Sequence, residues 1–163
     1  MGKPLLVGLL IVGGVGGAIY WFSTRPVPYS DEEGYSLGLP NGWEARKVGS
    51  QMAGSGPLTA GGVGTAMAAV YPYRTGQATR WPEEGRDGFM VLPDWSQPTE
   101  IGGARAVVAT FLDGGFRYFG AAVDRGNSLL VFRIGCSPEL FEKHRATFEK
   151  SARSIRLAPP KSR

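Results

Sequence analysis

The stretch from Leu5 to Phe22 constrains this chain more than any other, because it contains no charged or strongly polar side chain. A helix rises about 1.5 Å per residue, so about 18–20 residues are enough to cross a hydrocarbon layer roughly 30 Å thick. The sequence therefore predicts a single transmembrane helix over residues 1–23, with nearly all of the remaining chain on one side of the membrane.

Charges at the two ends of this stretch indicate its orientation. Lys3 and the α-amino group precede it, whereas Arg25 and then an acidic run follow it. Because positive charge is in excess on the cytoplasmic side of membrane helices, we expect the N-terminus in the cytoplasm. Tyr20, Trp21 and Phe22 are typical of the membrane interface and mark the outer boundary. The sequence thus predicts a single-pass protein of a bacterial inner membrane, with a periplasmic C-terminal domain.

A cleaved secretory signal is the alternative interpretation of the same stretch. Gly16 and Ala18 are small enough to form a cleavage site. Against cleavage, the positively charged region before the apolar run is very short, and the run continues beyond that site into three aromatic residues. The single cysteine, Cys136, lies far downstream, which excludes lipoprotein processing of this segment. We favour an uncleaved anchor.

A block of glycines lies inside the predicted anchor, at Gly13, Gly14, Gly16 and Gly17. Gly13 and Gly17 are four residues apart, so they share one face of a helix, where a neighbouring helix backbone can approach closely. This spacing predicts packing against a helix of a partner protein. The ordinary tolerance of membrane helices for glycine is the alternative.

Composition limits the rest of the chain. Of 163 residues, about 125 follow the anchor and its tether, enough for one domain with a hydrophobic core. The net charge is +4, but the basic residues are scattered and form no stripe or reader motif, which argues against nucleic-acid binding. A single cysteine excludes an intrachain disulfide, and Cys136 is expected to be buried at the end of a strand.

Proline and glycine divide the exported part. Residues 24–34 contain two prolines and are predicted to form a stiff tether. The domain is expected over residues 35–157, followed by a short tail over residues 158–163. It opens with an alternating strand over residues 35–39 and a turn at 40–42, after which a second strand starts.

The middle of the chain carries weaker signals. Residues 48–65 are rich in Gly, Ser and Thr but match neither the dinucleotide-binding nor the phosphate-loop pattern, so we expect a loop there. Residues 66–73 read as a buried strand. Residues 76–97 read as an irregular insertion rich in Pro, Gly and Trp.

Clear periodicity returns in the last third. Three strand-like segments, 104–112, 116–123 and 128–134, are separated by turn residues, which predicts an antiparallel meander. Ser137, Pro138 and Glu139 then indicate a helix start, with Ser137 as the N-cap residue.

The face of this final helix can be read from its apolar spacing. Phe141, Phe148, Ala152 and Ile155 recur at helical intervals and are expected to pack on the sheet. The helix is expected to end before two prolines at 159–160.

No catalytic constellation is visible. The one histidine, His144, lies between Lys143 and Arg145 and is therefore expected on the solvated face of the helix. There is no nucleophile elbow, and the acidic run 31–33 lacks the spacing of a calcium loop. We expect no catalytic residue, no metal site and no cofactor, and we expect that the protein is not an enzyme.

Aromatic residues on and beside the 76–97 insertion are candidates for a partner interface, since Trp and Tyr are enriched at binding hot spots. These candidates are Trp81, Phe89, Trp95, Tyr71 and Tyr73. The alternative is that they form a lid over the sheet.

The opening Tyr35-Ser-Leu-Gly-Leu-Pro-Asn-Gly-Trp43 and the closing Phe148-Glu-Lys-Ser-Ala-Arg-Ser-Ile-Arg156 resemble the two ends of PsbP-like domains. The resemblance spans most of residues 35–157. It implies an α+β domain: one antiparallel sheet of about six strands with helices packed on its faces, in an α/β/α sandwich. Members act as extrinsic or assembly subunits of membrane complexes, notably photosystems, or as envelope proteins without known activity. No histidine here matches a metal site of the family, so metal chemistry does not transfer.

These observations lead to one expected function and one alternative. The first is a non-catalytic accessory or stabilising subunit of a multi-subunit membrane complex, photosynthetic or respiratory. It would contact the lipid bilayer and an integral membrane complex through its helix and its periplasmic domain. The alternative is a free-standing anchored envelope domain that binds a small ligand in a cleft under the 76–97 insertion.

Overall fold

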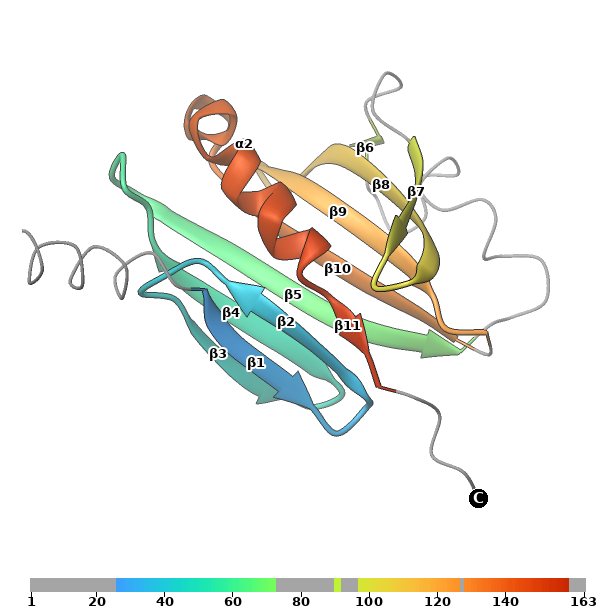
Figure 1. The fold of residues 1–163 in the computed structure, drawn as a ribbon. Helices are drawn as coiled ribbons and strands as arrows, with labels where there is room; N and C mark the ends of the chain where they lie inside the picture. Colours follow the sequence, from blue (N-terminus) through green and yellow to red (C-terminus); the bar gives the residue numbers. More distant parts are fainter. Residues whose placement is uncertain (1–25, 73–89, 92–96, 127, 159–163) are drawn as a thin grey trace, which may run out of the picture.

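The computed structural model describes residues 26–72, 90–91, 97–126 and 128–158, which form two antiparallel sheets and the helix α2 (Pro138–Arg153) (Figure 1). The larger sheet has the order β3 (Glu44–Val48), β4 (Gln51–Pro57), β5 (Val63–Pro72), β10 (Ser128–Cys136), β9 (Phe116–Asp124), β8 (Ala104–Asp113) and β6 (Met90–Val91). β7 (Gln97–Ile101) also pairs with β8. The smaller sheet has the order β1 (Val27–Asp31), β2 (Tyr35–Leu39) and β11 (Arg156–Leu157).

The two sheets and α2 are arranged in two layers. α2 contacts β9 and β10 on one side and β2 on the other, so the helix and the small sheet lie side by side over one face of the large sheet (Figure 1). The predicted α+β class with an antiparallel sheet is confirmed. The sheet has eight strands instead of about six. Within the described residues α2 is the one helix, so the small sheet, rather than a second helix, completes the covering layer.

The meander predicted for the last third of the chain is confirmed as β8, β9 and β10. Val108 lies opposite Ala121, and Ala121 lies opposite Phe132. Phe132 in turn lies opposite Ala68 of β5, a strand from the first half of the domain. This β5–β10 pairing joins the two halves of the chain into one sheet.

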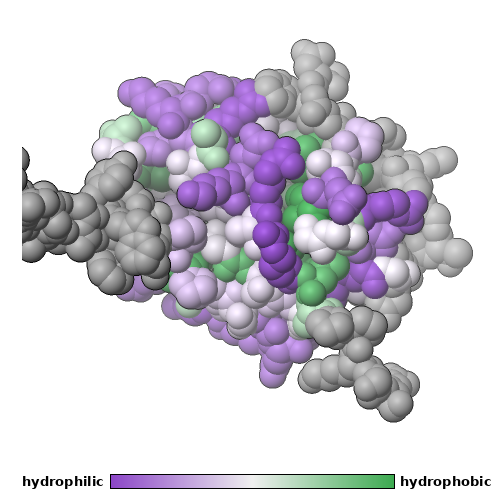
Figure 2. Space-filling model, viewed as in Figure 1, coloured by the Kyte–Doolittle hydropathy of each residue, from purple (hydrophilic) through white to green (hydrophobic). Residues whose placement is uncertain are grey.

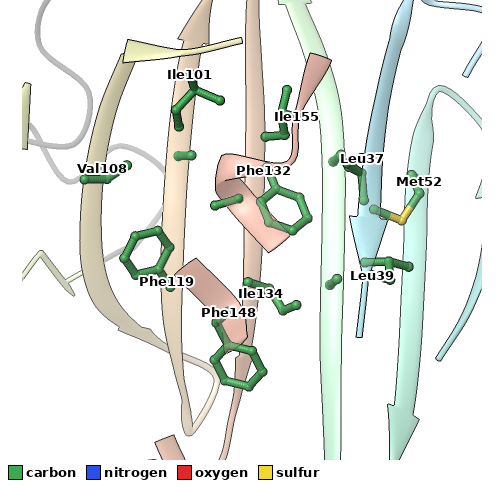
Figure 3. Close-up of a cluster of buried hydrophobic side chains, with 14 of the residues drawn as sticks. Leu37, Leu39, Met52, Ile101, Val108, Phe119, Phe132, Ile134, Phe148 and Ile155 are labelled. Atoms are coloured by element: carbon green, nitrogen blue, oxygen red, sulfur yellow. The ribbon is translucent and has the colours of Figure 1, made fainter. Parts of the chain in front are cut away.

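Alternate residues of the central strands form the core. Phe132 and Ile134 of β10 face Leu37 of β2 and Phe148 of α2 across the space between the layers (Figure 3). The apolar helix face predicted from spacing is confirmed for Phe141, Phe148 and Ala152, which are fully buried. Ile155 is fully buried as well, but it follows the end of α2. The outer surface on this side is mostly hydrophilic, with small hydrophobic areas between (Figure 2).

The loop predicted for residues 48–65 is wrong, because β4 and the start of β5 occupy this range. The glycines here serve close packing. A Cβ on Gly56 or on Gly64 would lie 2.4 Å from a ring atom of Trp43. Trp43 is buried, and its Nε1 donates a hydrogen bond to the Pro57 carbonyl oxygen at 3.1 Å. Glycine in these strands therefore leaves room for an indole ring. The resulting glycine-rich composition is the same as that of a loop.

Both ends of the domain differ from the sequence-based expectation. Val27–Asp31, inside the expected tether, forms β1 at the edge of the small sheet, where proline is tolerated because no ladder donor is needed. The helix ends at Arg153, and the chain returns as β11 to pair with Tyr35 and Ser36.

The predicted membrane anchor, with its glycines and its aromatic boundary, lies outside the described residues. Among the residues that the structure describes, no helix is long and apolar enough to cross a membrane.

Asp31 joins the small sheet to edge strand β3. It accepts hydrogen bonds from the Tyr29 hydroxyl at 2.7 Å and the Glu33 amide at 2.9 Å, and it lies 3.7 Å from Lys47 Nζ. Burial opposes ionisation of this carboxyl, but the hydrogen bonds from Glu33 and Tyr29 and the charge of Lys47 outweigh it and lower the pKa of Asp31. The ionised form therefore stabilises the fold.

This network predicts a specific pH dependence. The contribution of Asp31 to the free energy of unfolding is complete above the unfolded pKa of about 4, and it is lost as the pH falls further toward the lower folded pKa. Urea unfolding at pH 6 and pH 3 should show a smaller acid-induced loss for Asp31→Asn than for wild type. Equal losses in the two proteins would contradict the role of Asp31.

Candidate functional site

Two hollows lie on opposite faces of the large sheet. The first, here called the α2 pocket, has a volume of about 370 Å³ and lies between α2, the β2–β3 turn and the β4–β5 turn. Its lining residues are Pro26, Gly38, Leu39, Pro40, Asn41, Trp43, Pro57, Leu58, Thr59, His144, Thr147, Phe148, Lys150, Ser151 and Ser154.

The α2 pocket lies where the two PsbP-like sequence motifs meet. The Gly38 amide donates a hydrogen bond to Ser154 Oγ at 2.7 Å, across 116 positions of sequence. Ser154 Oγ also donates to the Ser151 carbonyl oxygen at 2.6 Å, which fixes the end of α2 against β2. Trp43 of the opening motif meets Phe148 of the closing motif edge-on, with ring centroids 6.3 Å apart.

The β2–β3 turn positions Trp43 for this contact. The Trp43 amide donates to the Pro40 carbonyl oxygen at 3.2 Å. Gly42 has φ +77°, a left-handed conformation in which glycine avoids the Cβ clash. The Pro-Asn-Gly-Trp segment of the sequence is thus a tight turn that delivers an indole to the core.

The expectation that His144 is solvated is wrong, because its side chain is only 5% exposed. The charged neighbours Lys143 and Arg145 were misleading, since adjacent residues on a helix point about 100° apart. His144 lies three residues after Phe141 and four before Phe148, which is the spacing of one helix face. That spacing is the signal that would have identified it as buried.

His144 is also incompletely satisfied. Its ring packs against Phe148, with centroids 6.1 Å apart, and its Nε2 is buried without a hydrogen-bond partner. An unpaired buried polar group costs about 1–3 kcal/mol. Since Nε2 bonds to neither Ser151 nor Ser154, no serine–imidazole pair of the hydrolytic kind forms through this atom. The imidazole thus lies beneath the floor of the α2 pocket, with Nε2 closed off from solvent and without a partner.

The second hollow, here called the rear groove, has a volume of about 580 Å³ and lies on the face of the large sheet opposite α2. Three of the side chains that the strand alternation directs into it from β4 and β5 are small, namely Ala53, Ser55 and Thr65. Larger residues stand around them: Glu44, Arg46, Met67, Tyr118 and Arg133. Small side chains between large ones explain the hollow.

Arg133 and Tyr118 form a fixed wall of the rear groove. Arg133 Nη1 donates to Asp113 Oδ2 at 2.7 Å, and its guanidinium carbon lies 5.0 Å from the centre of the Tyr118 ring. Tyr118 is stacked on Phe111, with ring centroids 5.5 Å apart. Both wall residues are thus held in place by contacts within the domain.

The predicted interface residues can be placed only in part. Tyr71 lies on β5 and is 42% exposed. Trp81, Phe89, Trp95 and Tyr73 lie outside the described residues. The sequence carries a signal for both wall residues. Arg133 and Tyr118 follow or precede the core residues Phe132 and Phe119 along their strands and therefore lie on the other face of the sheet.

Two further predictions concern the free cysteine and metal binding. Cys136 is fully buried at the end of β10, as expected, and burial raises the pKa of its thiol to about 11. Within the described ranges, no three side chains of His, Cys, Asp and Glu gather in a way that could hold a metal ion.

Comparisons with known proteins show which fold this is. No protein-family model matches the chain, and no curated protein matches it. The chain is similar to the solution structure of cyanobacterial PsbP (CyanoP) from Synechocystis sp. PCC 6803, with 15% identity and a TM-score of 0.60 over 82% of this chain and 93% of that one.

Two other solved structures share the architecture. A Pseudomonas aeruginosa protein of unknown function is 14% identical, with a TM-score of 0.51 over 85% of this chain and 99% of its own. A Bacteroides thetaiotaomicron VPI-5482 protein is 12% identical, with a TM-score of 0.52 over 86% of this chain and 50% of its own. Identities this low show the fold alone. The described domain has a PsbP-like fold.

Proposed function

We propose that this chain is a non-catalytic, membrane-anchored accessory subunit of a multi-subunit membrane complex, and that its periplasmic domain docks on a partner protein through the rear groove. The observation that carries the proposal is the rear groove itself, with small residues at its base and a fixed arginine and tyrosine in its wall. The PsbP-like fold supports photosynthetic complexes as the first candidates, with respiratory complexes next.

The chemistry of the rear groove suits a protein surface. Arginine and tyrosine are enriched at binding hot spots. Because Arg133 is held by Asp113 and Tyr118, little side-chain freedom is lost when a partner binds it. The exposed charges at the edge, Glu44 and Arg46, have opposite signs, which favours a mixed protein surface over a polyanion.

The anchor is the second part of the proposal. Gly13 and Gly17 would let the helix over residues 1–23 pack closely against a helix of the complex. Docking of the domain and packing of the helix would act together, since two linked contacts raise the overall affinity without new interactions at either one.

The proposal is tested by extracting the full chain in a mild detergent and measuring the mass of the native particles. We expect a particle that contains other membrane proteins. A monomer of 17.4 kDa that never co-purifies with another protein would contradict the accessory-subunit role. Replacing Gly13 and Gly17 by leucine without loss of co-purification would contradict helix packing alone.

A matched pair of variants tests the docking surface. Ser55→Arg places a bulky charge in the rear groove at an exposed position of β4. It should lower the amount of co-purified partner at least about tenfold, the equivalent of about 1.4 kcal/mol. Ala146→Arg adds the same side chain at an exposed position of α2, on the opposite face, and should leave co-purification unchanged. Equal effects of the two variants would exclude the rear groove as the docking surface.

A further inference from the structure

We propose that the outer edge of β3 pairs with β3 of a second copy of this chain, so that two domains share one continuous antiparallel sheet. The pairing is centred on Ala45 and places Glu44 of each copy opposite Arg46 of the other. This inference goes beyond the proposed accessory role, because it concerns contact between two copies rather than docking on another protein. It rests on the position of β3, the direction of its backbone groups and the charges beside them.

β3 is the last strand at one border of the large sheet (Figure 1). Among the residues that the structure describes, β4 is its one strand partner. Four of its five residues are exposed, so the strand is accessible along most of its length. An exposed edge strand presents backbone donors and acceptors that can pair with a strand of another chain. β3 therefore offers an open edge for strand addition.

The hairpin between β3 and β4 fixes which backbone groups point outward. Its loop has two residues, so the closing pair, Val48 and Gln51, is hydrogen-bonded within the hairpin. Hydrogen-bonded and non-hydrogen-bonded pairs alternate along an antiparallel ladder, so Arg46 also bonds to β4. The backbone amide and carbonyl groups of Ala45 and Lys47 therefore point away from β4, toward the outer edge.

The charges on β3 select the register. With a two-fold axis at Ala45, this residue exchanges two backbone hydrogen bonds with Ala45 of the second copy. The flanking pairs are of the non-hydrogen-bonded kind, in which side chains lie closest, and each joins a Glu44 to an Arg46. An axis at Arg46 would instead put two arginines directly opposite each other, and like charges in that position are destabilising. The register centred on Ala45 is therefore favoured.

Glu44 and Arg46 are available for these pairs. Both are exposed on the rear face of the large sheet, and neither side chain forms an ion pair or a hydrogen bond within the described part of the chain. Lys47 points to the opposite face, where its Nζ contacts Asp31 and Glu32 of its own chain. The third charge of β3 is thus already neutralised, and it does not compete for the cross-strand pairs.

The symmetry of this contact has a consequence for the rear groove. A two-fold axis perpendicular to the sheet leaves the same face of both copies on the same side, and the interface is self-complementary. Because Glu44 and Arg46 line the rear groove, the two grooves would lie beside the shared edge on one continuous surface.

Native mass measurement of the purified full chain in mild detergent, over a dilution series, tests the pairing. We expect the wild type to form a particle of two chains. Glu44→Arg places arginine opposite arginine in both flanking pairs and should weaken the dimer at least about tenfold. Glu100→Arg makes the same change at an exposed position of β7, which pairs with β8, and should leave the dimer unchanged.

Complementation identifies the register. Arg46→Glu should also weaken the dimer, but an equal mixture of Glu44→Arg and Arg46→Glu chains should restore it, because both flanking pairs then join opposite charges. A wild-type chain that stays monomeric, a Glu44→Arg dimer as stable as the wild-type dimer, or a mixture that fails to pair would each overturn the proposal. A dimer held by the glycines of residues 1–23 would not respond to Glu44→Arg. The chain is measured without other proteins, so the result is separate from the test of the accessory role.

Discussion

Replacing Gly64 by alanine is expected to destabilise the domain by about 3 kcal/mol, at the upper end of what overpacking of a core costs. The added Cβ would lie 2.4 Å from one ring atom of Trp43 and 3.1 Å from a methyl carbon of Leu58. Backbone preference acts in the opposite direction, because alanine in a strand is favoured over glycine by about 0.5–1 kcal/mol. The collision should prevail, since the indole is buried between the two layers. Urea unfolding followed by circular dichroism measures the change.

Two comparisons isolate the cause of the Gly64 effect. In a Trp43→Ala background, Gly64→Ala should cost much less than in wild type, so the double-mutant cycle should show a coupling of about 2 kcal/mol. Gly54→Ala lies on β4 with its nearest contact at 3.1 Å from a Leu39 methyl carbon, the end of a flexible side chain, and should be mild. Additive effects of Gly64→Ala and Trp43→Ala would exclude the collision as the cause.

Replacing Phe148 by alanine is expected to lower the free energy of unfolding by about 3–5 kcal/mol. Phe148 is fully buried and lies at the centre of an aromatic group, with ring centroids 5.9 Å from Phe141, 6.1 Å from His144 and 6.3 Å from Trp43. Phe141 and His144 are fixed on the same helix and Trp43 is held by the β2–β3 turn, so the three rings cannot all move inward and a cavity should remain. The measurement is the urea midpoint at constant m-value.

A surface valine provides the control for Phe148. Val48 is 51% exposed on edge strand β3, and Val48→Ala should change stability by no more than about 0.5 kcal/mol. A Phe148→Ala variant that lost less than about 1 kcal/mol would show that the neighbouring rings collapse into the space. In that case the α2 pocket would also be more adaptable than its packing suggests.

Much of the fold could be predicted because its signals are local. The strands β8, β9 and β10 alternate with turn residues, and Ser137 and Pro138 mark the start of α2. The cap illustrates the limit of such signals: Ser137 occupies the N-cap position but makes no capping hydrogen bond through its side chain. The residue types at 137 and 138 locate the start of α2 correctly, but they do not show what the Ser137 hydroxyl bonds to.

The candidate sites could not be predicted to the same extent. The glycines of β4 and β5 have the composition of a loop, and only the indole lying against them explains why they are in strands. The charged chain neighbours of His144 predict the solvated face, although its neighbours along the helix face, Phe141 and Phe148, are core residues. The rear groove depends on strand order, since Ser55, Thr65 and Arg133 become neighbours only when β4, β5 and β10 pair.

The sequence by itself determined the antiparallel meander, the apolar face of α2, the burial of Cys136 and the apolar stretch before the domain. Each of these features follows from a local periodicity or composition. Only the tertiary structure decided that Gly38 bonds to Ser154, that Trp43 lies on two glycines, and that His144 is left with a buried, unpaired nitrogen. These features arise from contacts between segments as much as 116 residues apart, and local patterns carry no information about which distant segment will supply the other half of a contact.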